Sequence, residues 1–181
     1  KNALLTYVEN GGSLLIADGK TALRFEEVLG VRMEKEPVAR RSTLSIRGKK
    51  MSDRGGWYKA HASSAEVIFN RYIGEGPLNR LSSIDVREEG VSEAVSARTE
   101  SFPAVVVRPY GKGLIAAMFG NYARQYYDHH HPFVRDMFGI ISKRLFASPA
   151  FTVQASPTVD VSLRTSAAGR LQVHLVNTTC M

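Results

Sequence analysis

The sequence predicts an α/β domain followed by a second unit built of β-strands. Residues 2–30 contain a helical pattern, a short apolar run and a second helical pattern, which is the layer order of α/β proteins. Residues 104–119 hold two apolar runs around a turn, and residues 158–177 alternate with a period of two. The change of period near residue 148 predicts the boundary between the two units.

The first segment predicts a helix, a buried strand and another helix. Apolar residues at positions 3, 4, 7 and 8 have the spacing of an amphipathic helix, and Gly11 or Gly12 can end it in a left-handed conformation. The run SLLIAD, residues 13–18, is short and apolar enough for a buried strand. Residues 21–31 predict a second short helix that ends at Gly30.

The middle of the chain predicts a basic insertion at about residues 32–100. Residues 42–48 alternate like a half-buried strand, and residues 65–74 fit a strand or a short helix. Residues 48–59 between them are polar and glycine-rich, which favours a loop. Most of the net charge of +7 lies in residues 32–59, where nine Lys or Arg accompany three acids. We therefore expect residues 32–59 to be irregular and mobile beside the sheet.

Three clearer elements follow. The runs 104–107 and 114–119 flank PYGKG, whose glycines permit a tight hairpin turn. Pro132 suits the first position of a helix over residues 133–146. Residues 158–164 and 170–177 predict an antiparallel hairpin with His174 pointing away from its strand's apolar face. Because two strands alone are marginally stable, we expect this hairpin to belong to a larger β-domain.

The sequence DHHH, residues 128–131, raises the question of a metal site. In an extended segment His129 and His131 could share one side, with Asp128 as a third ligand. Adjacent side chains diverge, however, so three consecutive histidines rarely bind one metal. We interpret the stretch as the polar start of the following helix and expect neither a metal nor a cofactor.

A second candidate contact site lies in the basic segment. Trp57 and Tyr58 follow two glycines and could stack on a sugar ring or a base, with Arg54 and Lys59 beside them. A solvated loop with one aromatic anchored in the domain or at a subunit contact explains the same residues. We prefer this second interpretation.

Several motifs resemble a known family. The stretches LLTYVENGGSLLIADG, EVLGV and VVVRPYGKGLIAAMFGNYA resemble the later half of a class I glutamine-amidotransferase-like, flavodoxin-like α/β domain. The version they resemble most is the β-galactosidase trimerisation domain of bacterial glycoside-hydrolase-like proteins. Residues 133–179 resemble its final helix, the proline-marked linker that follows, and the entry into a β-sandwich through a strand that ends in HLVN. The resemblance covers residues 1–31 and 102–179.

The resemblance implies a fold and a setting. It implies a flavodoxin-like three-layer sandwich over residues 1–148, incomplete at its N-terminus, and the start of a β-sandwich over residues 149–181. It also implies a catalytic (β/α)-barrel upstream in the same protein, and assembly into a homo-oligomer. The chain would then be a fragment of a longer protein.

Catalysis by this chain is not expected. A superfamily amidotransferase needs a cysteine nucleophile on a strand-to-helix elbow, whereas the sole cysteine, Cys180, follows the final hairpin. A glycosidase needs two opposed carboxylates, but the pairs Glu26–Glu27 and Glu88–Glu89 are adjacent in sequence and point apart. The resemblance places the catalytic acids in the barrel, so we assign no catalytic residue here.

These observations leave two functional hypotheses. The first is a non-catalytic accessory and oligomerisation domain of a carbohydrate-active protein, for which carbohydrate is a possible ligand. The second is a binding module whose residues 32–59 recognise an anionic partner, either an acidic glycan or, less favoured, nucleic acid. With no apolar run of membrane-spanning length, no leader pattern and one cysteine, we expect no membrane partner and favour the cytoplasm.

Overall fold

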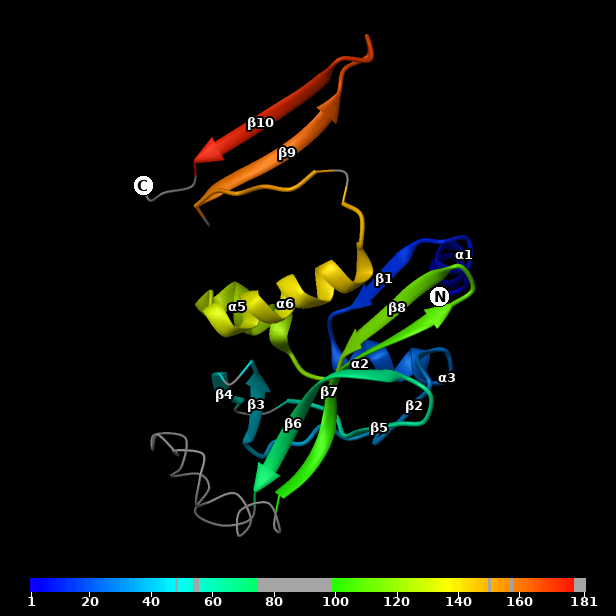
Figure 1. Ribbon diagram of the computed structural model, residues 1–181. Coiled ribbons are helices and arrows are strands. Elements are labelled where there is room, and N and C mark those ends of the chain that lie inside the picture. The colour runs from blue at the N-terminus through cyan, green and yellow to red at the C-terminus, as the bar shows by residue number, and fades with distance from the viewer. Residues whose placement is uncertain (48, 54–55, 75–98, 150, 157, 178–181) are drawn as a thin grey trace. The chain divides into compact units, whose positions relative to one another are not determined.

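The computed structural model describes residues 1–47, 49–53, 56–74, 99–149, 151–156 and 158–177. The chain forms two compact units, Lys1–Phe146 and Ala147–Met181 (Figure 1). The first unit contains a curled sheet with helices, and the second contains a β-hairpin. The predicted α/β class with a C-terminal hairpin is confirmed.

A six-stranded mixed sheet runs through the first unit in the order β1-β8-β7-β6-β3-β4. Its strands are β1 (Ser13–Ile16), β3 (Ser42–Ile46), β4 (Lys49–Asp53), β6 (Glu66–Gly74), β7 (Thr99–Tyr110) and β8 (Gly113–Met118). Among the described strands, β1 and β8 form the parallel pair of this sheet, and its other neighbours are antiparallel. The sheet is therefore mostly antiparallel, as at β7 and β8, which are joined by the tight turn that PYGKG predicts.

Helices cover both faces of this sheet. The described helices are α1 (Asn2–Glu9), α2 (Gly19–Ala22), the 3₁₀ turn η1 (Leu23–Phe25), α3 (Glu26–Leu29), α5 (Tyr122–His129) and α6 (Pro132–Leu145). The predicted second helix is thus three short pieces, which end at Gly30 with a left-handed φ of 65°. Pro132 occupies the first turn of α6, as predicted.

Alternation along β8 divides the core between the two faces. Ala116 and Met118 pack in one cluster with residues of α6, including Met137. Ile115 and Ala117 pack in another cluster with Phe25 and Leu29. A central sheet between two helical layers is the arrangement expected of an α/β sandwich.

The basic segment is more regular than expected: β3 lies in residues 42–48, which alternate like a strand in the sequence, but β4 lies in a stretch predicted to be a loop. Its residues form β3 and β4 within the main sheet, and β2 (Val31–Met33) pairs with β5 (Ala60–Ala62) in a separate ribbon. Along β4, buried Met51 and Asp53 alternate with exposed Lys50 and Ser52. Lys50 therefore lies on the solvent side of an edge strand, where charge is compatible with regular structure. The expected mobility is untested, and residues 75–98 of the predicted insertion lie outside the described residues.

The second unit is the predicted antiparallel hairpin of β9 (Val159–Thr165) and β10 (Leu171–Asn177). Its register sets Val173 opposite Leu163 and Leu175 opposite Val161. Leu175 is 68% exposed and Val173 is 59% exposed, so one apolar face has little cover within the described part of the chain. Membership of a β-sandwich remains a prediction.

Candidate functional site

The carboxyl ends of β1 and β8 form the edge at which a ligand would bind in an α/β sheet. In open α/β sheets, ligands bind in the crevice outside the carboxyl ends of the parallel strands. Here β1 is followed by Asp18 and Gly19, and β8 is followed by Phe119 and Gly120. The strands are adjacent and parallel, so these two segments lie at the same edge.

Tyr58 closes this edge. Its backbone N–H donates to the carbonyl oxygen of Phe119 at 2.8 Å, and the residue is only 8% exposed. The ring lies against Gly19 so closely that an added Cβ there would be 2.5 Å from a ring carbon. The position where such folds hold a ligand is therefore filled by a side chain of the protein itself.

Asp18, at the same edge, is engaged in local structure. Its Oδ2 accepts hydrogen bonds from the Thr21 backbone N–H at 2.9 Å and from the Thr21 hydroxyl at 3.0 Å. These bonds cap the N-terminus of α2, the usual role of an aspartate before a helix. Asp18 therefore has a structural role at this edge.

Trp57, next to Tyr58, lies entirely inside the domain. Its Nε1–H donates to the carbonyl oxygen of Arg40 at 2.9 Å, and its ring centroid is 6.1 Å from that of Phe102. Lys59 is partly buried; its Nζ lies 5.1 Å from the Phe102 centroid and 3.7 Å from Oε1 of Glu34. The two aromatic rings thus have little or no exposed face to offer a sugar. Arg54 lies outside the described residues.

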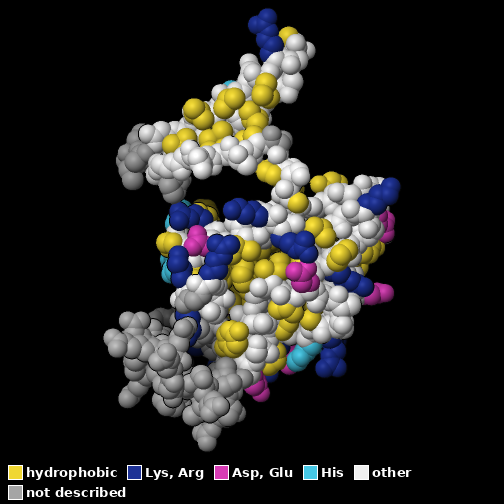
Figure 2. Space-filling view, viewed as in Figure 1, with side chains coloured by type: hydrophobic (Ala, Val, Ile, Leu, Met, Phe, Trp, Pro, Cys, Tyr) yellow, Lys and Arg dark blue, Asp and Glu magenta, His cyan; other side chains and the backbone are white. Residues whose placement is uncertain are grey.

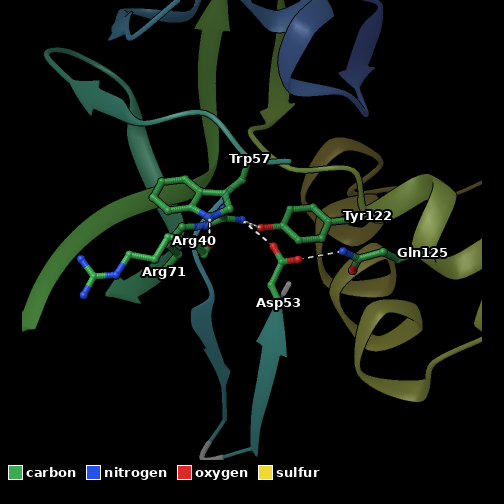
Figure 3. A network of polar contacts seen from close by, with 6 residues as sticks. All are labelled: Arg40, Asp53, Trp57, Arg71, Tyr122 and Gln125. Carbon is green, nitrogen blue, oxygen red and sulfur yellow. Dashed lines mark hydrogen bonds and ion pairs between the residues drawn. The ribbon is translucent and has the colours of Figure 1, made fainter. Parts of the chain in front are cut away.

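A buried polar network lies beside Trp57 (Figure 3). Arg71 of β6 donates through Nη2 to Oδ2 of Asp53 at 3.1 Å and to the hydroxyl oxygen of Tyr122. Gln125 of α5 donates to the other carboxylate oxygen of Asp53 at 2.8 Å. The indole of Trp57 covers the guanidinium, whose central carbon is 4.1 Å from the ring centroid. The network ties β4 and β6 to α5.

Burial decides the electrostatics of this network. The side chains of Arg71 and Asp53 are both fully shielded from solvent, so each charge depends on the other for compensation. Burial also raises the pKa of Tyr122, so its hydroxyl stays neutral at physiological pH. Both oxygens of Asp53 already accept hydrogen bonds. The arrangement therefore fits a structural role, joining β4, β6 and α5, better than the role of a general acid or base.

The sequence does contain a signal for this network, although the sequence interpretation missed it. Arg71 alternates with the buried residues Phe69 and Ile73, so it interrupts the apolar face of a strand. Asp53 likewise follows Met51 at a spacing of two. A charge on an apolar strand face demands a partner, but which partner it meets depends on long-range pairing.

The histidines form the connection between α5 and α6. His129 ends α5, His130 adopts a left-handed φ of 49°, and Nδ1 of His131 accepts the Phe133 backbone N–H at 3.2 Å. Asp128 accepts from Nε of Arg124 at 2.7 Å. Over the described ranges, no group of three or more His, Cys, Asp or Glu side chains is placed to hold a metal ion. The predicted polar start of α6 is present, and it follows a helix, α5, that the polar sequence did not reveal.

Comparison with known proteins points to a fold rather than a family. No protein-family model matches the chain, and no curated protein matches it. Among solved structures, a catalytic mutant of a GH42 β-galactosidase from G. stearothermophilus matches with a TM-score of 0.53 and 17% identity, over 92% of this chain and 22% of that chain. Another structure of a GH42 β-galactosidase matches with a TM-score of 0.50 and 18% identity, over the same shares.

These matches show that the chain shares the fold of part of a GH42 β-galactosidase. The chain spans about a fifth of the length of the β-galactosidase chains that it matches. The glycoside-hydrolase-related fold inferred from the sequence motifs is supported, while the trimerisation domain is not separately tested. In the part that the structure describes, no helix has both the length and the apolar character needed to cross a bilayer.

Proposed function

We propose that this chain is a non-catalytic accessory and oligomerisation part of a larger glycoside-hydrolase-like protein. The observation that carries the proposal is the closed edge at β1 and β8, where Tyr58 fills the position of a ligand crevice. The fold likeness to part of a GH42 β-galactosidase supports the setting. Asp18 lies near this edge and Asp53 lies in the buried network. Both carboxylates accept structural hydrogen bonds.

The assembly half of the proposal is supported by two surfaces. β1 lies at one edge of the main sheet and carries no charged residue, whereas the other edge strand, β4, carries Lys49 and Lys50. Lysines on an edge strand discourage pairing with another chain, and their absence leaves the edge open to it. The apolar hairpin face of Val173 and Leu175 also fits cover by further strands of a β-sandwich. An upstream catalytic barrel and further copies of the protein are the proposed partners.

The proposal predicts no turnover by the 181-residue chain. Purified chain is expected to hydrolyse neither aryl-glycosides nor glutamine, because no described residue at the closed edge is free to act on them. The longer parent protein, assayed beside it, is expected to hydrolyse or bind a carbohydrate and to show an oligomeric mass by light scattering on a sizing column. Glycosidase or glutaminase turnover by the chain would refute the accessory role, and a strictly monomeric parent would refute the oligomerisation role.

A second candidate function rests on the basic surface. Arg47, Lys49 and Lys50 are exposed around the β3–β4 turn, and Nζ of Lys49 is 3.5 Å from Oδ2 of Asp136 on α6. Figure 2 shows further Lys and Arg side chains gathered over α5 and α6. An acidic glycan is the partner that this surface would fit. Its binding would weaken steeply with added salt, whereas an apolar subunit contact would not.

A further inference from the structure

The guanidinium of Arg71 is incompletely hydrogen-bonded. Arg71 is fully buried, and its Nη2 donates to Asp53 and Tyr122. Its Nε and Nη1 are buried as well and have no hydrogen-bond partner among the described residues. Buried donors in native proteins are almost always bonded to protein or to ordered water, so these two donors indicate that something further binds here.

We propose that at least two water molecules bind inside the domain at Nε and Nη1 of Arg71. The planar guanidinium directs its N–H groups outward in its own plane, and the N–H groups of Nε and Nη1 point in different directions. One small acceptor therefore cannot serve both atoms. Trp57 covers one face of the guanidinium, which leaves the positions in its plane for the acceptors.

The charge balance identifies the acceptors as water rather than an anion. Arg71 contributes one positive charge and Asp53 one negative charge, and Tyr122 is neutral because burial raises its pKa. A bound anion would add an uncompensated negative charge in a site without solvent, which is costly. A water oxygen accepts hydrogen bonds from the N–H groups without adding charge. A buried water in turn needs such polar partners.

Ser42 is a further candidate partner for this internal water. It lies opposite Asp53 in the β3–β4 register, and its buried Oγ also has no hydrogen-bond partner among the described residues. A serine hydroxyl both donates and accepts, so it can bond to a water that has already accepted from an arginine. Three incompletely bonded polar atoms on neighbouring strands are better explained by internal water molecules than by three separate defects.

A crystal structure of the wild-type chain, at a resolution that shows ordered water, tests the proposal. We expect oxygen peaks about 2.7–3.2 Å from both Nε and Nη1, with displacement factors like those of the surrounding core. Direct bonds from these atoms to protein carbonyls, or no density beside them, would overturn the proposal. The crystals are also soaked in bromide, and an anomalous peak at either nitrogen would show an anion site and overturn it too.

A solution measurement provides an independent check. In a ¹⁵N-labelled sample, the Hε of Arg71, assigned by its absence from Arg71→Lys, is expected to show a cross-peak to a long-lived water. An Hε with no water cross-peak and rapid exchange with solvent would contradict an internal site.

Discussion

Asp53→Ala is expected to destabilise the protein by about 3–5 kcal/mol, the usual effect of removing one member of a buried ion pair. The substitution leaves the guanidinium of Arg71 without a compensating charge in a site shielded from solvent. It also removes the acceptor for Gln125, which loosens the attachment of α5. The free energy of unfolding from urea denaturation, followed by circular dichroism, measures the effect.

Two variants serve as controls for this prediction. Combining Asp53→Ala with Arg71→Met is expected to cost clearly less than the sum of the single substitutions, because no buried charge is then left unpaired. Lys49→Ala breaks an exposed ion pair whose lysine side chain is 73% exposed, and we expect a change within about 1 kcal/mol. If Asp53→Ala lowered the free energy of unfolding no more than Lys49→Ala, the buried Arg71–Asp53 pair would not stabilise the fold.

Gly113→Ala is expected to cost about 3 kcal/mol, at the upper end of the range for overpacked sites, or to prevent folding. A Cβ at this position would lie 2.0 Å from the carbonyl oxygen of Gly12 and 2.4 Å from that of Val8. Both obstacles are backbone atoms, so neither can move aside by changing a rotamer. Relief requires moving β8 away from the end of α1, which disturbs the β1–β8 pairing.

Gly139→Ala is the matched control. Gly139 lies within α6, and a Cβ there would meet nothing within 4 Å. Alanine is favoured over glycine in a helix interior by about 1 kcal/mol, so this variant is expected to be more stable than the wild type. Equal thermal midpoints for the two alanine variants would contradict the close approach at Gly113.

The elements that could be predicted from sequence are those with local signals. The PYGKG turn, the proline before α6 and the period of two in residues 158–177 each specify structure through neighbours in sequence. Gly30 ends its helix because a left-handed residue is needed there. The apolar runs 13–18 and 114–119 contain strands, as predicted, and the parallel pairing of these strands follows the α/β pattern.

The remainder depends on contacts between distant segments. β4 begins with two exposed lysines, and only its pairing with β3 shows that the strand belongs to the sheet. The same holds for Trp57, whose burial depends on Arg40 and Phe102. A glycine-flanked aromatic in a basic segment looks the same in sequence whether it is exposed or buried. The closed edge at Tyr58 could not be predicted for this reason.

The protection of one backbone amide tests the closed edge most directly. The Tyr58 N–H donates to the carbonyl oxygen of Phe119. This hydrogen bond breaks only if the segment that contains Tyr58 leaves the carboxyl ends of β1 and β8. In native-state hydrogen exchange we expect Tyr58 to exchange as slowly as the core amide of Ala117 in β8, through global unfolding. Exchange of Tyr58 at the rate of an exposed loop, with Ala117 still protected, would show that the edge opens in the native protein and would contradict the closed, non-catalytic domain.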